Sequence, residues 1–168
     1  MTKTDMIRAY GDDDFALLSL WVTDPYVLFQ YSGTYFSWPL TRKQIADYLE
    51  RYPERKFYIG CDAAGKPYAF GEIIPKADQP PRLGRLLVGD PEMRGKGLGG
   101  MFVRELVAGI RETMDPAAVD LFVLEENLQA IRCYEKAGFR FVPGEHFDLV
   151  FRGTAYRVLK MRLLLKAE

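Results

Sequence analysis

A glycine-rich run joins two apolar segments of this chain, and it reads Arg94-Gly95-Lys96-Gly97-Leu98-Gly99-Gly100. The segment before it, Arg82–Val88, is rich in leucine and is followed by Gly89 and Pro91, a pattern typical of a strand and its end. After the run begins, apolar residues recur at positions 98, 102, 103, 106, 107 and 110, the spacing of one helix face. The run therefore connects a strand to a long helix.

The composition of this run favours the binding of a phosphate group. Glycines let several backbone N–H groups converge, and the first turn of the helix adds unpaired N–H groups and a partial positive charge. Arg94 and Lys96 add two full positive charges. A simple turn does not need four glycines in six residues, so we interpret the run as a phosphate-binding loop.

The glycine spacing excludes the P-loop. That motif requires four residues between its glycines and a Ser or Thr after its lysine, whereas five residues separate Gly89 from Gly95 and Gly97 follows Lys96.

The dinucleotide-binding pattern G-x-G-x-x-G is met by Gly95, Gly97 and Gly100, and Glu125 or Glu126 then takes the place of the ribose-binding acid. However, the preceding strand ends seven residues before Gly95, and too little chain follows the loop for a doubly wound sheet. An NAD-binding oxidoreductase is therefore kept only as an alternative.

A second segment carries a further signal, and it reads Asn127-Leu128-Gln129-Ala130-Ile131-Arg132-Cys133-Tyr134-Glu135-Lys136-Ala137-Gly138-Phe139. Together the two segments resemble the GNAT superfamily of N-acetyltransferases. The glycine run matches that family's acyl-CoA signature, which is Arg or Gln, two residues, Gly, any residue, then Gly or Ala. The chain looks like the branch containing ribosomal-protein N-terminal and aminoglycoside 6'-N-acetyltransferases.

The resemblance implies one acetyltransferase domain over residues 1–168 with an α/β fold. The expected sheet is mixed and mostly antiparallel, with helices on both faces. Its two parallel strands, which end near Val88 and Leu124, are expected to splay apart. The pantetheine arm of acetyl-CoA would lie in the gap between them.

The same resemblance implies the residues that bind the cofactor. The backbone of Leu87 and Val88 should pair with the pantetheine amides and polarise the acetyl carbonyl. The loop should hold the pyrophosphate, and Asn127 should lie at the entry to the second helix. The expected loop contacts are Arg94, Gly95, Lys96, Gly97, Leu98 and Gly99.

Tyr134 is the candidate general acid. On a helix that starts near Asn127, the spacing to Ile131 and Tyr134 places all three residues on one face. The pKa of a phenol is ordinarily about 10 and that of a thiol about 8.5, so a neutral phenol can donate a proton to a departing thiolate. The resemblance assigns this role to Tyr134.

The general base is harder to place. An amine attacks only when neutral, and many members of the family carry a glutamate for this purpose on the strand before the glycine loop. Arg82–Val88 has no carboxylate. We expect Glu72, acting through water, as the first substitute. The further candidates are Glu125, Asp90 and His146.

These features predict an enzyme that moves acetyl from acetyl-CoA directly to a primary amine of a small molecule or a protein N-terminus. Besides the oxidoreductase, a catalytically silent acyl-CoA-binding regulatory module is an alternative, because the strand lacks its carboxylate.

A polycationic antibiotic acceptor is disfavoured by the basic segment Tyr156–Leu165. The aromatic residues between Trp21 and Trp38 are expected to supply some walls of an acceptor pocket and, in the majority, core packing.

Charge and composition exclude several other classes. The chain has 23 basic and 23 acidic residues, so we expect no nucleic-acid partner. No apolar run reaches the roughly 18 residues of a membrane span, and no signal peptide is evident. With one histidine and two cysteines, Cys61 and Cys133, we expect no metal, no disulfide and a cytoplasmic protein. A homodimer is an open alternative.

The periodicity and turn residues predict the element order β, α, α, β, β, β, α, β, α, β, β. The expected strands cover 6–10, 56–62, 68–74, 82–88, 119–124, 140–142 and 156–165, with a loop or hairpin over 143–154. The expected helices cover 12–23, 41–52, 98–110 and 128–137.

Overall fold

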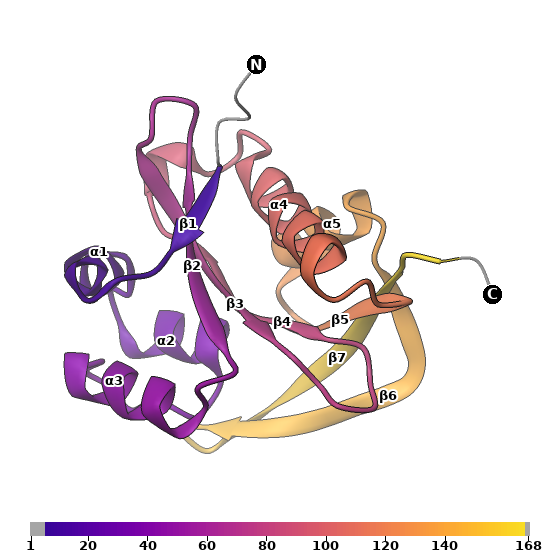
Figure 1. Ribbon diagram of the computed structural model, residues 1–168. Helices are drawn as coiled ribbons and strands as arrows, with labels where there is room; N and C mark the ends of the chain where they lie inside the picture. The colour runs from indigo at the N-terminus through magenta and orange to yellow at the C-terminus, as the bar shows by residue number, and fades with distance from the viewer. Residues whose placement is uncertain (1–5, 167–168) are drawn as a thin grey trace.

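The computed structural model describes residues 6–166, which form one seven-stranded sheet with helices on both faces (Figure 1). The strands are β1 (Ile7–Ala9), β2 (Lys56–Cys61), β3 (Pro67–Ile74), β4 (Arg82–Val88), β5 (Ala118–Leu124), β6 (Arg140–Phe151) and β7 (Thr154–Leu164). The helices are α1 (Phe15–Trp21), α2 (Pro25–Ser32), α3 (Arg42–Arg51), α4 (Leu98–Thr113) and α5 (Leu128–Lys136). Two short 3-10 turns, η1 (Asp12–Asp14) and η2 (Pro91–Met93), precede α1 and the glycine loop.

The sheet has the strand order β1-β2-β3-β4-β5-β7-β6, and every neighbouring pair is antiparallel except β4 and β5. These two parallel strands pair only at Arg82 with Asp120 and at Leu83 with Leu121. Beyond Leu83 they diverge. The expected mixed sheet with a splayed parallel pair is therefore confirmed.

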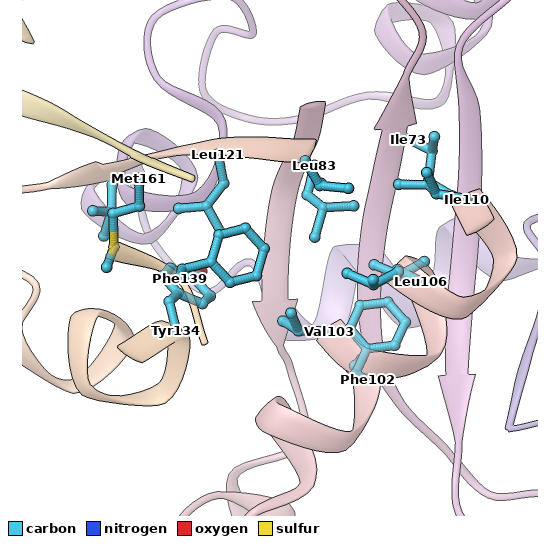
Figure 2. Close-up of a cluster of buried hydrophobic side chains, with 14 of the residues drawn as sticks. Ile73, Leu83, Phe102, Val103, Leu106, Ile110, Leu121, Tyr134, Phe139 and Met161 are labelled. Atoms are coloured by element: carbon cyan, nitrogen blue, oxygen red, sulfur yellow. The ribbon is translucent and has the colours of Figure 1, made fainter. Parts of the chain in front are cut away.

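Two large hydrophobic cores, and a smaller cluster of Phe29, Leu124 and Val158, hold the helices to the sheet. On one face α4 and α5 pack through residues such as Phe102, Leu106 and Tyr134, together with Leu83 and Leu121 of the parallel strands (Figure 2). On the other face α1, α2 and α3 pack through a cluster rich in aromatic side chains, including Trp21, Tyr31, Tyr48, Phe57 and Phe70. Both faces of the sheet are thus covered, as expected for the fold class.

The beginning of the chain differs from the prediction in one detail. The acidic run expected to open the first helix forms the turn η1 instead, and α1 begins at Phe15. Asp14 is buried, ion-pairs with Arg8 at 2.8 Å and accepts a hydrogen bond from the Gly11 N–H at 2.8 Å. The carboxylate is therefore used to tie the turn to β1.

Helix α2 was missed by the sequence analysis, which treated this part only as an aromatic segment. The Asp24 carboxylate caps it by accepting from the Val27 N–H at 2.9 Å, and Pro25 occupies the first turn. Seven of its eight residues are aromatic, β-branched, polar or proline, so its intrinsic helix propensity is weak. Packing against the sheet, rather than propensity, stabilises it.

The region 143–154 is part of a hairpin rather than a loop. Strand β6 continues through Pro143 and Gly144 to Phe151, and its register against β7 shifts between Phe141 and His146. Such an irregularity accommodates proline and glycine, which otherwise indicate the end of a strand. The short predicted strand 140–142 was therefore wrong in length.

Residues 6–166 contain neither a membrane-spanning helix nor a cluster of metal ligands. No helix there is long and apolar enough to cross a bilayer. No group of three or more metal-ligating side chains lies together in the same residues.

Helix α4 approaches the sheet closely because two glycines face it. A Cβ built on Gly60 would lie 2.6 Å from the Phe102 ring, and one built on Gly71 would lie 2.8 Å from the same ring. The ring is buried between them, so it has no free space to move into. This contact sets the distance between α4, which carries the glycine loop at its start, and the sheet.

We expect Gly71→Ala to destabilise the fold by about 1–3 kcal/mol, because the added methyl overpacks the Phe102 contact. The matched control is Gly109→Ala in the same α4, where a Cβ meets no atom within 4 Å. That change should be neutral or should stabilise by about 0.5–1 kcal/mol. Urea unfolding of both variants measures this, and equal stabilities would contradict the close-packing argument.

Candidate active site

A cleft of about 850 Å³ opens where β4 and β5 separate. Its walls come from β4, the glycine loop and the start of α4 on one side, and from β5 and α5 on the other. It continues past the end of α2 to the β6–β7 hairpin. One cavity therefore joins the expected phosphate-binding loop to Tyr134 and to a second region lined by α2 and β6.

The backbone of β4 has an unpaired edge inside this cleft. On its other side β4 stays paired with β3, where Leu87 lies opposite Phe70 and Val88 opposite Ala69. Because β5 has already diverged, the edge facing it has no ladder partner beyond Leu83. Such N–H and C=O groups can pair with an extended ligand containing amides.

The loop glycines are needed for two different reasons. Gly95 and Gly97 have φ values of 77° and 76°, in the left-handed region that disfavours other residues. At Gly99 the reason is packing, since a Cβ there would lie 3.3 Å from both the Cys133 Sγ and a Val88 methyl. The absence of side chains thus brings the start of α4 against β4 and α5.

The start of α4 is held in place by a side chain from the sheet. The Tyr68 hydroxyl donates a hydrogen bond to the Leu98 carbonyl at 3.0 Å. Arg94 reaches back to β4, where its Nε donates to the Val88 carbonyl at 3.0 Å. Its guanidinium lies at the junction of the loop and the unpaired strand edge, where an anionic ligand would meet it.

Most of the cofactor-binding residues expected from the sequence line this single cleft. They are Leu87, Val88, Arg94, Gly95, Gly97, Leu98, Gly99 and Asn127. Lys96 is exposed and is not part of the cleft wall. Asn127 caps α5, with its Oδ1 accepting from the Ala130 N–H at 3.3 Å.

Tyr134 lines the cleft from α5. The side chain is buried, and its ring lies edge-on to the Phe139 ring, with the ring centroids 6.3 Å apart. The hydroxyl makes no hydrogen bond with any residue in 6–166. Burial raises the pKa of the phenol above its ordinary value of 10.0, and the neighbouring Cys133 raises it further. The phenol is thus a neutral donor without a protein acceptor.

Both cysteines are free thiols in the structure. Cys61 is buried, and Cys133 is half-buried in the cleft wall. Burial raises the pKa of the Cys133 thiol, so it is not activated as a nucleophile.

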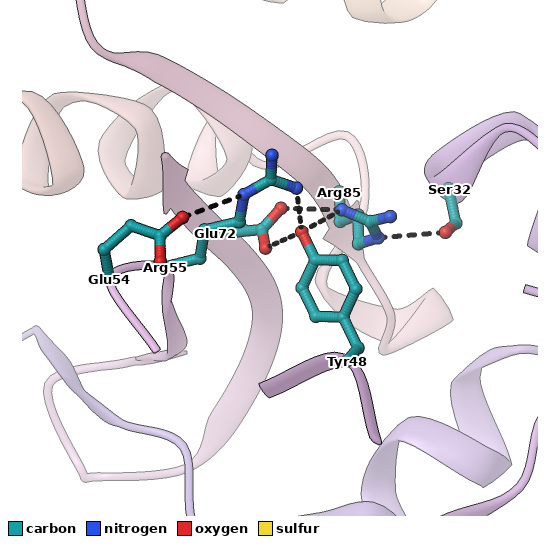
Figure 3. Close-up of polar contacts among 6 residues, drawn as sticks. All are labelled: Ser32, Tyr48, Glu54, Arg55, Glu72 and Arg85. Carbon is teal, nitrogen blue, oxygen red and sulfur yellow. Dashed lines mark hydrogen bonds and ion pairs between the residues drawn. The ribbon is translucent and has the colours of Figure 1, made fainter. Parts of the chain in front are cut away.

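Glu72 lies in a buried network rather than in the cleft wall (Figure 3). Its side chain is 0% exposed, and its Oε1 accepts from Arg85 Nη1 at 2.7 Å. Its Oε2 accepts from the Tyr48 hydroxyl. That hydroxyl accepts in turn from Arg55 Nη1 at 2.7 Å and from Arg85 Nη1 at 2.9 Å. Both carboxylate oxygens are therefore engaged.

Local backbone geometry explains how this network forms. Gly84 lies opposite Glu72 in the sheet, and a Cβ on it would lie 3.0 Å from Glu72 Oε1, so the missing side chain leaves room for the carboxylate. The register between β3 and β4 is irregular here, and Arg85 adopts a φ of 48°. A bulge of this kind redirects a side chain, and it coincides with the guanidinium lying over the Tyr48 ring at 4.4 Å.

The remaining base candidates lie outside the cleft wall. Asp90 ion-pairs with Lys66 at 3.2 Å. His146 is exposed on β6, and Glu125 is exposed after β5.

The aromatic segment divides between the cleft and the core. Phe29, Tyr31 and Tyr35 line the cleft, whereas Trp21 and Phe36 are buried in the core of that face. The Tyr31 hydroxyl is buried and has no hydrogen-bond partner among the described residues.

Sequence reasoning did not single out three arginines of the cleft wall, Arg55, Arg82 and Arg85. Arginines spaced along a strand look like ordinary surface residues. Only the curvature of the sheet and the bulge at Arg85 show that these side chains gather at one end of a cavity.

Comparisons with known proteins agree with this geometry. Residues 17–139 match the family model described as the acetyltransferase (GNAT) family. The spermine/spermidine N(1)-acetyltransferase of Bacillus subtilis is 30% identical over 113 residues, which are 65% of this chain and 70% of that protein.

Solved structures show the same fold. The spermidine N-acetyltransferase of Vibrio cholerae, in complex with CoA and spermine, has a TM-score of 0.77 at 16% identity and 94% coverage of both chains. An aminoglycoside acetyltransferase in complex with coenzyme A and kanamycin has a TM-score of 0.72 at 19% identity, covering 95% of this chain and 94% of that one. With the family model matching most of its length, this chain belongs to the GNAT family of acetyltransferases.

Proposed function

We propose that this chain transfers an acetyl group from acetyl-CoA directly to a primary amine of a small molecule. The observation that carries the proposal is one cleft that contains the glycine loop, the unpaired edge of β4 and the Tyr134 phenol. Because the chain belongs to an acetyltransferase family, the hypothesis of an NAD-binding oxidoreductase is set aside.

The residues of the cleft fit coenzyme A along its length. The loop N–H groups and Arg94 would bind the pyrophosphate, since a helix start and a guanidinium both attract anions. The free edge at Leu87 and Val88 would pair with the pantetheine amides. When bound, acetyl-CoA supplies the activated acetyl group and the thiolate leaving group.

Tyr134 is the proposed general acid. The acceptor nitrogen forms a bond to the acetyl carbon, the carbon–sulfur bond breaks, and the phenol donates its proton to the departing thiolate. A raised pKa keeps this proton on the oxygen until the thiolate forms. The proton that the nitrogen loses on becoming an amide passes to water, and the phenolate takes a proton back from water to complete the cycle.

We assign Glu72 a positioning role in place of the base expected from the sequence. Both of its oxygens already accept hydrogen bonds and its side chain has no exposed surface, so a water in the cleft cannot reach the carboxylate. Its proposed task is to hold Arg85 and Tyr48.

Deprotonation of the acceptor then needs no carboxylate in contact with it. Arg55, Arg82 and Arg85 line the end of the cleft beyond the thioester position. Positive neighbours and burial both lower the pKa of a bound ammonium, so the neutral amine binds preferentially and its proton leaves to solvent.

A silent acyl-CoA-binding module remains the second candidate, because no carboxylate is found in the described cleft wall. Release of free CoA in the presence of amines separates the two, since a binding module releases none.

The use of acetyl-CoA and the two free thiols support a cytoplasmic location. A homodimer stays a prediction.

We expect Tyr134→Phe to lower kcat by about 100-fold, the usual contribution of a general acid, with little change in acetyl-CoA affinity. The matched control is Tyr58→Phe, whose ring lies outside the cleft wall. Steady-state kinetics with calorimetric titration of acetyl-CoA measures both quantities. An unchanged kcat would remove Tyr134 from the mechanism.

We expect Arg94→Gln to weaken acetyl-CoA binding by about tenfold or more, because a charge-assisted contact to phosphate is lost. The control is Arg111→Gln, at an exposed position in the last turn of α4, which should leave the affinity unaltered. Both affinities are measured by isothermal titration. Equal affinities for the two variants would contradict the assignment of Arg94 to the pyrophosphate.

We expect kcat/KM to rise by about tenfold per pH unit on the acid side and then to level off, because only the neutral amine reacts. The pKa of Tyr134 lies above 10.0, so its proton is retained and no falling limb should appear below that pH. A pH–rate profile at saturating acetyl-CoA tests this. A falling limb near pH ~8 that disappears in Tyr134→Phe would contradict the raised pKa.

A further inference from the structure

The acceptor end of the cleft carries positive charge without matching negative charge in its wall. Arg82 and Arg85 lie on the first half of β4, away from the glycine loop, and Arg55 follows α3 nearby. The described wall of the cleft contains no Asp or Glu. Behind the wall, Glu72 offsets one of the three guanidinium groups.

Arg85 is already neutralised and held. It bonds to Glu72, to the Tyr48 hydroxyl and, through its Nε, to the Ser32 Oγ at 3.0 Å (Figure 3). Its side chain is only 10% exposed. The charge of Arg85 is therefore already balanced by Glu72, and its guanidinium is not available to pair with an anionic ligand.

Arg82 is different, because it has no ion pair and no side-chain hydrogen bond with any residue in 6–166. Its guanidinium lies over the Phe122 ring, 4.9 Å from the centroid, and the residue is half-buried. Burial lowers the pKa of this guanidinium, and Arg55 and Arg85 lower it further while Glu72 raises it. A guanidinium stays protonated under such shifts, so Arg82 presents five N–H donors that lack a protein acceptor.

Arg55 is also incompletely paired. Its Nη1 donates to Tyr48, but its Nε is buried without a hydrogen-bond partner. The nearest carboxylate, Glu54, lies 3.9 Å from that Nε and is largely exposed to water. The field at this end of the cleft therefore remains positive.

The walls beside Arg82 are apolar. Phe122 and Phe147 meet edge-on at 5.2 Å and are 37% and 41% exposed, although both line the cleft. Leu149 and Tyr35 also line the cleft, and Tyr35 lies under the Arg85 guanidinium at 5.5 Å. Large apolar side chains left open beside an unpaired cation are suited to a ligand with a carbon skeleton and an anionic end.

We propose that the amine acceptor carries a carboxylate or similar oxyanion, separated from its amine by an apolar spacer, and that Arg82 binds this anionic group. The proposal rests on the transferase function proposed above and specifies its substrate class. An anion here would satisfy the N–H donors of Arg82, since carboxylates pair with a guanidinium through two parallel hydrogen bonds.

The same charges act against polycationic acceptors. The relatives described above are named for spermine, spermidine and aminoglycosides. A second ammonium group bound at this end would face Arg55 and Arg82 with no carboxylate in the described wall to receive it. We therefore expect this chain to differ from those relatives in its acceptor.

The test compares acceptors that share a skeleton and differ in the terminal group. 6-Aminohexanoate, hexylamine and 1,6-diaminohexane form one set, with 6-aminohexylphosphonate as a second oxyanion. A second set is 4-(2-aminoethyl)benzoate and phenethylamine, in which the ring separates the carboxylate from the amine. Release of CoA gives kcat and KM for each. We expect kcat/KM to be at least tenfold higher for the anionic member of a set than for the neutral or cationic one.

Arg82→Gln should raise KM for the anionic acceptors by about tenfold or more, with little change in kcat, because binding that is equal in ground and transition states is lost. For hexylamine and phenethylamine, which have no anionic group for Arg82 to bind, the loss should be several-fold smaller, because only the effect of one positive neighbour on the pKa of the amine is removed. Arg82→Lys should restore part of the preference, and Arg111→Gln, an exposed change outside the cleft, should alter none of it. Thermal unfolding of each variant separates loss of binding from loss of fold.

The outcomes separate the two proposals. If neutral amines or diamines are the better acceptors, or if Arg82→Gln slows all acceptors equally, the anionic acceptor is refuted while the transferase stands. If no amine in the panel releases CoA although acetyl-CoA binds, the transferase proposal fails and the acceptor proposal fails with it.

Discussion

The function of this molecule depends on the early parting of its two parallel strands. β4 and β5 pair over only two residues each, with Leu83 and Leu121 buried at the point where they diverge. Backbone groups need partners, and an unpaired edge inside a cavity can be satisfied by a ligand. α4 and α5 hold the gap open by packing on the sheet. Phe102 of α4 lies over Gly60 and Gly71, and Gly99 of α4 allows close contact with Cys133 of α5. Without this separation the glycine loop and Tyr134 would not share a cleft.

The second constraint is the buried ion pair of Glu72 and Arg85. Burying two charges carries a large desolvation cost, so such a pair adds little to the free energy of unfolding. Its effect here is to fix the position of the Arg85 guanidinium. It engages Glu72, which lies behind the cleft wall, with Arg85, one of the three arginines that line the acceptor end. The positive field that remains comes mainly from Arg82 and Arg55. The acceptor end therefore differs chemically from one lined by acidic residues, although the fold is the same as in the polyamine and aminoglycoside relatives.

The local parts of the fold could be predicted because their causes are local. Apolar spacing indicated α4, the Thr41 side chain caps α3 by accepting from the Gln44 N–H at 3.2 Å, and Gly138 follows α5 with a φ of 101°. Where packing against distant strands overrides propensity, the prediction failed, as it did for α2. It also failed for β6, because a bulge against β7 carries the strand through Pro143, which otherwise marks an end.

The amino-acid sequence alone determined the family resemblance, the glycine loop and the candidate role of Tyr134, because each depends on residue types at short, regular spacing. Only the tertiary structure decided what surrounds the acceptor. Glu72, Tyr48, Arg55 and Arg85 come from separate segments and meet through sheet register and a bulge at Arg85. Burial and pairing of charges are properties of that assembly, so they decide which carboxylate is engaged and which arginine remains open to a ligand.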